Sequence, residues 1–124
     1  MDYDCRGERL TILFVEDDPL VRWMGAESLV DAGFTVLEAG CAEEALAILQ
    51  SRDDVSVLFT DIDMPGACDG LELADIAHRR WPHLHILIAS GRCSPRHMPE
   101  NGRFLPKPYG PEQVTRQIGA MLAA

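Results

Sequence analysis

Basic side chains are scarce in this sequence, and those that it has are almost all arginine. Eleven Lys and Arg residues stand against twenty Asp and Glu residues, the formal net charge at pH 7 is −9, and Lys107 is the only lysine. An acidic surface argues against nonspecific binding to nucleic acid, which requires a basic face, and against docking on anionic lipid. We therefore expect neither nucleic acid nor a membrane among the partners.

Long apolar runs and paired cysteines are also missing. No run approaches the ~20 apolar residues that a bilayer-spanning helix needs, and residues 1–9 are too polar for a secretory signal peptide. The four cysteines lie far apart without a Cys-x-x-Cys motif, and no histidine stands at zinc-ligand spacing from them: Cys5, Cys41, Cys68 and Cys93. This pattern favours reduced thiols and predicts a cytoplasmic protein.

Short apolar segments alternate with segments of helical periodicity along the 124 residues. We expect strands over residues 10–15, 34–38, 55–59, 85–89 and 104–105, and helices over residues 20–32, 42–50, 69–80 and 111–122. Regular alternation of this kind indicates an α/β fold with a doubly wound, five-stranded parallel sheet flanked by helices. Residues 1–8 are predicted to be a polar lead-in, and residues 9–124 one domain.

Several details of these elements are predictions that a structure can test. Leu20, Val21, Met24, Leu29 and Val30 recur at roughly helical spacing in the first helix, and Trp23 in that helix is interpreted as a packing residue. In the last helix, residues 114, 118, 121 and 122 are expected to face the core. Residues 91–103 are polar and contain two prolines and two glycines, so we expect no more than one helical turn there.

Polar side chains follow four of the predicted strands at the points where they end. Glu16 and Asp17 follow the first strand, Asp61 the third and Ser90 the fourth, while Lys107 follows the fifth. Because the carboxyl ends of parallel strands share one edge of the sheet, where ligands of such folds bind, these five side chains are expected to meet.

The chemistry of this set is coherent. Clustered carboxylates repel one another unless a cation shares the site, and hard oxygen ligands favour Mg²⁺. The metal and Lys107 would place positive charge on two sides of Asp61, and the Ser90 hydroxyl is able to donate a hydrogen bond. Cations around a nucleophilic carboxylate are what phosphoryl transfer requires. We therefore predict that Asp61 accepts a phosphoryl group as an acyl phosphate.

These motifs, in this order, resemble the receiver domain of two-component response regulators over about residues 10–122. The resemblance is carried by the acidic pair after the first strand, the Asp-x-Asp-Met-Pro-Gly block at 61–66, Asp69-Gly70, the hydroxyl residue Ser90, and Lys107-Pro108. It implies a flavodoxin-like sheet of strand order 2-1-3-4-5. Residues 91–103 depart from the family, because this region is shorter than the usual fourth loop and helix.

The resemblance also implies roles for single residues. Asp61 is the phosphoacceptor, and Asp17, Asp61 and the backbone carbonyl of Asp63 bind Mg²⁺, with Glu16 acting directly or through water. Ser90 and Lys107 contact the phosphoryl oxygens. The Lys107–Pro108 peptide is expected to be cis, which a peptide bond before proline can adopt at low cost.

Residues for switching and for the lifetime of the phosphoryl group are implied by the same resemblance. Ser90 and Phe104 stand at the positions of the hydroxyl and the aromatic ring that rearrange on phosphorylation, which is a population shift between two states. Asp63 and Arg92 lie two residues beyond Asp61 and Ser90. We hypothesise that they pair across the phosphoryl group and obstruct the hydrolytic water.

Three functions remain open from the sequence. The first is a stand-alone receiver, not a classical enzyme, that takes a phosphoryl group from a histidine kinase or histidine phosphotransfer protein and signals to a downstream protein; we expect no output domain after Leu122. The second is a phosphate-independent adaptor. The third is an aspartyl-phosphate phosphatase, because Asp61-Ile62-Asp63 resembles the opening motif of haloacid-dehalogenase-like enzymes.

Overall fold

The computed structural model describes residues 10–62, 70–91 and 102–123. Their elements alternate as β1 (Thr11–Val15), α1 (Pro19–Asp31), β2 (Thr35–Ala39), α2 (Ala42–Ser51), β3 (Val57–Asp61), α3 (Gly70–Arg80), β4 (His85–Ser90), β5 (Gly102–Pro106) and α4 (Pro111–Ala123). All strand pairs are parallel and the order is β2-β1-β3-β4-β5. The predicted fold class and strand order are thus confirmed.

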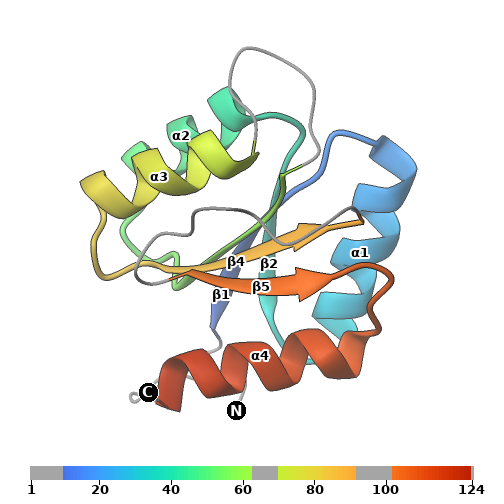
Figure 1. The fold of residues 1–124 in the computed structure, drawn as a ribbon. Coiled ribbons are helices and arrows are strands. Elements are labelled where there is room, and N and C mark those ends of the chain that lie inside the picture. The colour runs from blue at the N-terminus through green and yellow to red at the C-terminus, as the bar shows by residue number, and fades with distance from the viewer. Residues whose placement is uncertain (1–9, 63–69, 92–101, 124) are drawn as a thin grey trace.

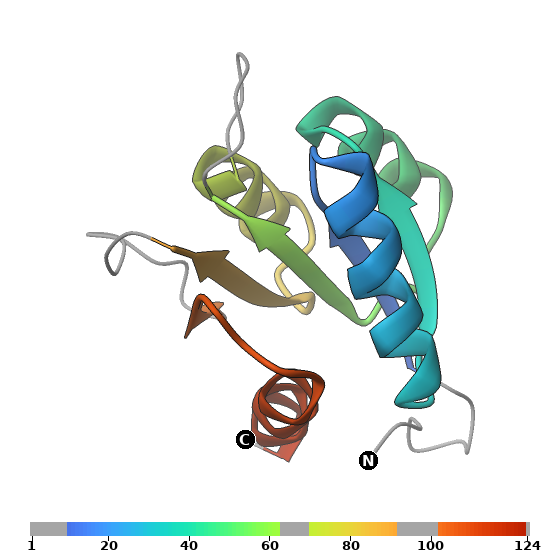
Figure 2. The same cartoon turned by 90° about the vertical axis from the view of Figure 1, so that its right-hand side faces the viewer.

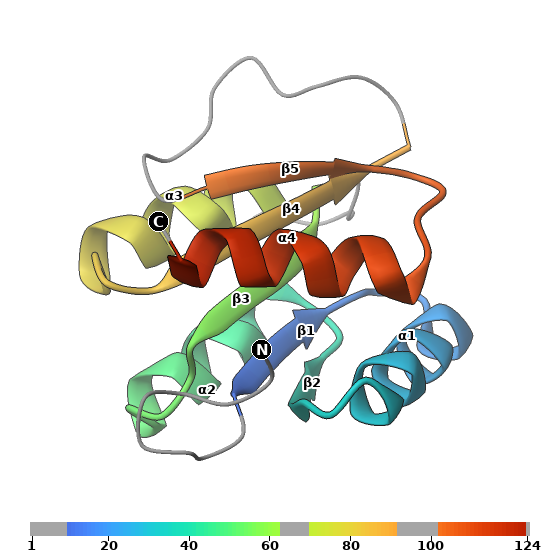
Figure 3. The ribbon, with the colours of Figure 1, turned by 90° about the horizontal axis from the view of Figure 1, so that it is seen from below.

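Helices cover both faces of this sheet. Figures 1 and 3 show α2 and α3 on one side and α4 on the other, and Figure 2 shows α1 running beside β2. The core is divided accordingly: Leu13, Val15, Leu58 and Ile88 pack with α2 and α3. Ile12, Phe14, Phe59 and Leu87 pack with α1 and α4. Side chains of a strand alternate between its two faces, so the continuous apolar runs of the sequence belong to strands buried on both sides.

The first helix differs from its prediction in what it buries. Only Leu29 of the five expected apolar residues is buried, together with Ala26, whereas Leu20, Val21, Met24 and Val30 are exposed. Residues 22, 25, 26 and 29 fall on one side of the helix by the 3.6-residue repeat, and the other apolar residues are distributed around it. Trp23 is 59% exposed, so its interpretation as a packing residue is wrong.

The remaining boundaries shift by a few residues. β5 begins at Gly102 instead of residue 104, because Gly102 and Arg103 pair with Ile86 and Leu87 of β4. Leu122 was expected in the core and is 36% exposed. Gly33 ends the first helical segment with a positive φ of 103°, a conformation that glycine adopts without strain. The predicted irregular segment at 91–103 lies, for residues 92–101, outside the described residues.

Candidate phosphoacceptor site

Four strand ends converge at the carboxyl edge of the sheet. Val15 pairs with Thr60 in register, Asp61 with Ala89, and Ser90 with Pro106. Asp61 is the last residue of β3 and Ser90 the last of β4, while Glu16 directly follows β1 and Lys107 directly follows β5. The structure therefore brings the predicted polar residues to one edge, as parallel pairing requires.

Asp61 and Lys107 form the centre of the site. The Nζ atom of Lys107 donates a hydrogen bond to Oδ2 of Asp61 in an ion pair. The side chain of Asp61 is only 9% exposed and that of Lys107 31%. The backbone supports this contact, because the N–H of Lys107 donates to the carbonyl of Ser90 at 2.9 Å. The Lys107–Pro108 peptide is cis, as predicted.

Glu16 is the second buried carboxyl group of the site. It is 5% exposed, and its Oε2 accepts the backbone N–H of Asp18 at 3.1 Å. Burial raises the pKa of Glu16 above its usual value, and the side chain of Asp17 and the charge of Asp61 act in the same direction. The hydrogen bond from Asp18 and the charge of Lys107 oppose this shift in the pKa. Glu16 and Asp61 therefore share one electrostatic environment.

Ser90 and Phe104 occupy neighbouring strands. Ser90 is 2% exposed at the end of β4. Phe104, which is partly buried on β5, pairs in register with Ile88, two residues before Ser90. Because side chains two apart on a strand share a face, Ser90 and Phe104 lie on the same face of the sheet. The other residues predicted to tune the site, Asp63 and Arg92, fall outside the described residues.

Tyr109 is a residue of this region that the sequence analysis did not identify. The centroid of its ring lies 5.5 Å from that of Phe59, and the centroids of Phe59 and Phe14 lie 5.2 Å apart, so the three tilted rings form one aromatic cluster. Burial raises the pKa of Tyr109 to about 12, and the charges of Glu16 and Asp61 contribute. The only sequence signal was an aromatic residue directly after the Lys-Pro pair.

Gly70 explains why α3 is able to begin so close to the end of β3. A Cβ atom at this position would lie 2.1 Å from the backbone carbonyl oxygen of Asp61. That distance is far shorter than any real contact, and the obstructing atom belongs to the backbone. The Asp69-Gly70 motif of the sequence therefore has a steric role, since only glycine permits this close approach.

The acids at this edge have the chemistry of metal ligands. Within residues 10–62, 70–91 and 102–123, no three His, Cys, Asp or Glu side chains are arranged to hold a metal ion by themselves. Glu16 interacts with both Asp17 and Asp61, and their carboxylates are the hard oxygen ligands that Mg²⁺ prefers. The acids thus fit a Mg²⁺ site that needs a further ligand, and the expected one, the carbonyl of Asp63, lies outside the described residues.

None of the helices in the described part of the chain is long and apolar enough to cross a bilayer.

A parallel α/β domain with an ion-paired aspartate at its carboxyl edge defines a narrow class of proteins, and comparisons with known proteins agree with it. The sequence model of the response regulator receiver domain matches residues 12–118. The chain belongs to this family. It is a receiver domain of the two-component systems, which is a signalling phosphoacceptor domain and not a classical enzyme.

Individual relatives support the same assignment. The chain is 32% identical to sensor kinase CckA of Brucella abortus over 118 residues, which are 90% of this chain and 12% of that protein. A crystal structure of the receiver domain from the hybrid histidine kinase CckA is similar with a TM-score of 0.77 and 33% identity, covering 90% of this chain and 98% of that one. A receiver domain from Clostridium thermocellum has a TM-score of 0.85 at 22% identity, with 92% and 94% coverage, and shows the fold alone.

These relatives are much longer than the region of similarity. The chain spans only 12% to 16% of the first three curated proteins that it matches. These three proteins are a sensor kinase, a response regulator and a sensor protein of bacteria. Their similarity therefore concerns the receiver domain and not the activities of the whole proteins.

Proposed function

We propose that this chain is the phosphoacceptor of a two-component phosphorelay, and that Asp61 receives the phosphoryl group from a histidine kinase or a histidine phosphotransfer protein. The observation that carries this proposal is the ion pair between the buried Asp61 carboxylate and Lys107, the only lysine of the chain. A buried carboxylate held beside an ammonium group is suited to in-line phosphoryl transfer, because negative charge on the transferred group must be neutralised.

The chemical step balances without a further reactant. An oxygen of Asp61 attacks the phosphorus of the donor phosphohistidine, a P–O bond forms, and the P–N bond breaks with its electron pair remaining on that ring nitrogen; the other ring nitrogen carries a proton, so the leaving group is neutral imidazole. Lys107 neutralises the phosphoryl oxygens, and the Ser90 hydroxyl donates a hydrogen bond to one of them. Glu16, Asp17, Asp61 and the backbone carbonyl of Asp63 would hold Mg²⁺, which would supply further positive charge to neutralise the phosphoryl oxygens.

The signal leaves by a change in a protein-interaction surface. Ser90 moves toward the phosphoryl group, and Phe104 on the neighbouring strand follows it, because both side chains lie on one face of the sheet. A downstream protein then distinguishes the two states. Asp63 and Arg92 set how long the signal lasts by obstructing the hydrolytic water; unchanged dephosphorylation rates in Asp63→Asn and Arg92→Ala would refute this part.

The test uses intact-mass spectrometry after incubation with MgCl₂ and a small phosphodonor. Acetyl phosphate and phosphoramidate are both used, because phosphoramidate contains the P–N bond of phosphohistidine. We expect one labile phosphoryl group on the wild type and none on Asp61→Asn. Asp54→Asn is the matched control: Asp54 is an exposed acid that pairs with Arg52 after α2, and this variant should be phosphorylated normally.

The other outcomes identify the alternatives. A wild type that acquires no phosphoryl group from either donor contradicts the proposal and favours the phosphate-independent adaptor. Rapid turnover of p-nitrophenyl phosphate, abolished in Asp61→Asn, favours the phosphatase.

A further inference from the structure

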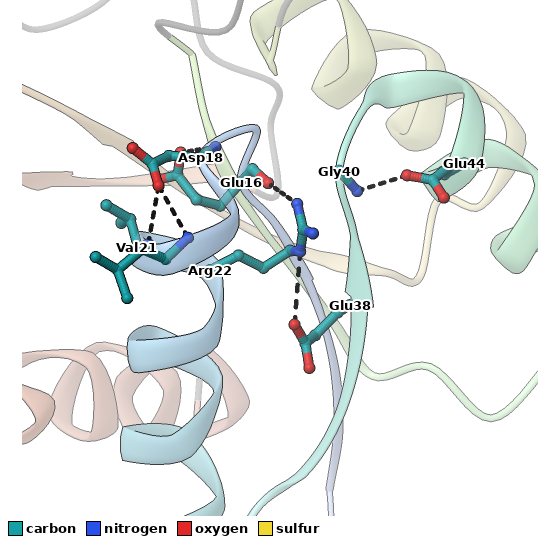
Figure 4. A network of polar contacts seen from close by, with 8 residues as sticks. Glu16, Asp18, Val21, Arg22, Glu38, Gly40 and Glu44 are labelled. Atoms are coloured by element: carbon teal, nitrogen blue, oxygen red, sulfur yellow. Dashed lines mark hydrogen bonds and ion pairs between the residues drawn. The ribbon is translucent and has the colours of Figure 1, made fainter.

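Arg22 connects the loop that carries two of the site acids to the edge strand of the sheet (Figure 4). Its Nη1 donates a hydrogen bond to the backbone carbonyl of Glu16 at 2.9 Å. Its Nε lies 3.5 Å from Oε1 of Glu38 on β2. The Arg22 side chain is 24% exposed, so these contacts are partly shielded from water. One guanidinium group thus links α1, the loop after β1, and β2.

The guanidinium group of Arg22 occupies space that is free because residue 40 is a glycine. A Cβ atom on Gly40 would lie 2.9 Å from Nη1 of Arg22 and 3.1 Å from Oε1 of Glu44. The same Oε1 accepts the backbone N–H of Gly40 at 2.7 Å. Arg22 and Glu44 therefore occupy the volume that a side chain at position 40 would need. The backbone at Gly40, directly after β2, therefore passes close to the guanidinium group of Arg22.

Other contacts fix the loop on both sides of Asp17. The backbone N–H of Glu16 donates to the carbonyl of Ala39 at 3.1 Å. Oδ1 of Asp18 caps α1 by accepting the backbone N–H groups of Leu20 and Val21, at 2.9 and 3.2 Å. The carbonyl that Arg22 binds belongs to the peptide between Glu16 and Asp17. Holding this carbonyl fixes the orientation of the peptide from which Asp17 projects.

We propose that Arg22 is a positioning residue for Mg²⁺ binding, because its guanidinium fixes the Glu16–Asp17 peptide so that both carboxylates are presented together. This inference rests on the proposed phosphoacceptor function. The acids at this edge repel one another, so an unsupported loop would separate them when the metal is absent. A fixed loop lowers the cost of ordering them when the metal binds.

A purely structural role for Arg22 makes a different prediction. If Arg22 only joined α1 to β2, its loss would lower thermal stability and leave the affinity for Mg²⁺ unchanged. A positioning role raises the Mg²⁺ concentration needed for half-maximal phosphorylation and preserves the rate at saturating Mg²⁺. The separation of these two effects is therefore the informative measurement.

The experiment compares the wild type with Arg22→Ala, Arg22→Lys and Gly40→Ala. The Mg²⁺ dissociation constant is measured by following backbone amide resonances of residues 16–18 by NMR during titration with MgCl₂. Phosphorylation by acetyl phosphate is measured across the same Mg²⁺ range. Arg52→Ala is the matched control, because Arg52 also pairs with a carboxylate, Asp54, on the exposed surface after α2.

We expect Arg22→Ala to raise the Mg²⁺ dissociation constant about tenfold, which is the usual scale for losing a group that orients a metal ligand. Arg22→Lys should recover only part of this loss, since one ammonium group lacks the fork that reaches both partners. Gly40→Ala should raise the dissociation constant less than Arg22→Ala does, because the atom that its Cβ would meet is the flexible end of the Arg22 side chain, which is able to shift. The rate at saturating Mg²⁺ should stay within about twofold of the wild type, and Arg52→Ala should behave as the wild type.

Failure of the proposed role of Arg22 and failure of the proposed phosphoacceptor function give different results. If the wild type binds Mg²⁺ and is phosphorylated while all three variants keep its dissociation constant within about twofold, the role of Arg22 is overturned and the proposed function stands. If the wild type itself neither binds Mg²⁺ nor accepts a phosphoryl group, both are overturned. Far-UV circular dichroism of each variant shows whether it is folded, and Arg22→Lys provides the test if Arg22→Ala is not.

Discussion

Replacing Lys107 with Met tests the electrostatic centre of the site. The substitution keeps most of the length and apolar stem of the side chain and removes the ammonium group that binds Asp61. The backbone hydrogen bond from residue 107 to the carbonyl of Ser90 is unaffected by it. The change in the free energy of unfolding should therefore report mainly the ion pair.

The burial of the two side chains sets the expected magnitude. Two opposite unit charges about 4 Å apart attract by about 4 kcal/mol at an effective dielectric constant of about 20. Water weakens this attraction, because 31% of the Lys107 side chain is exposed. The desolvation of the Asp61 carboxylate, whose side chain is only 9% exposed, also subtracts from the net stabilisation by the ion pair. We expect Lys107→Met to lower the free energy of unfolding by about 2 kcal/mol, which corresponds to about 6–10 °C in Tm.

The measurement is urea unfolding at pH 7 in metal-free buffer, for the single variants Lys107→Met and Asp61→Asn and for the double variant. The double variant should be more stable than the sum of the single losses predicts, because it leaves neither charge unpaired. A coupling energy of about 1–2 kcal/mol is expected. A loss below about 0.5 kcal/mol together with additive single effects would refute the view that this pair is a buried electrostatic contact.

Three further predictions concern neighbouring residues. Because the pKa of folded Glu16 is raised, its ionisation lowers stability as pH rises above about 4.5. Glu16→Gln should therefore raise the free energy of unfolding at pH 7 in metal-free buffer, by about 1.4 kcal/mol per unit of the pKa shift measured by NMR. A gain in stability that persists at pH 4 contradicts this prediction. The pKa of Tyr109 is raised to about 12, so wild-type stability should fall between about pH 10 and 12 by about 1–3 kcal/mol more than that of Tyr109→Phe in chemical denaturation. Gly25→Ala would place a Cβ atom 2.7 Å from the Phe14 ring, whereas a Cβ atom at Gly119 would have nothing within 4 Å. Thermal melts should show a loss of stability of about 1–3 kcal/mol for Gly25→Ala and a gain of about 0.5–1 kcal/mol for Gly119→Ala. Equal effects of the two substitutions would refute the steric argument.

The sequence alone predicted that the site residues lie together, because their proximity depends on the topology of the sheet. Once the strands are parallel, the residues at their carboxyl ends share an edge whatever the details of packing. Asp61, Ser90 and Lys107 could therefore be placed together before any side-chain position was known. The cis peptide before Pro108 had a different basis, because it was predicted from the family resemblance.

Contacts between helices and loops were less predictable. Arg22 looked like one of ten interchangeable arginines, and its partner on the loop is a backbone carbonyl that no sequence pattern marks. The apolar residues of α1 misled for a related reason: the helix lies against β1 and the edge strand β2, where Ala26 and Leu29 suffice for packing. Tyr109 was missed because its approach to the charges of Glu16 and Asp61 depends on the path of the chain after β5.

The separation of the two central residues along the chain has a consequence for synthesis on the ribosome. Asp61 closes β3, whereas Lys107 comes 46 residues later, after β4 and β5. A nascent chain that has emerged only as far as β4 contains the acids without the cation that the folded site provides. Under the proposed function, competence to accept a phosphoryl group is therefore gained late, when β5 has joined the sheet, and a chain truncated before residue 107 would compete poorly for the phosphodonor.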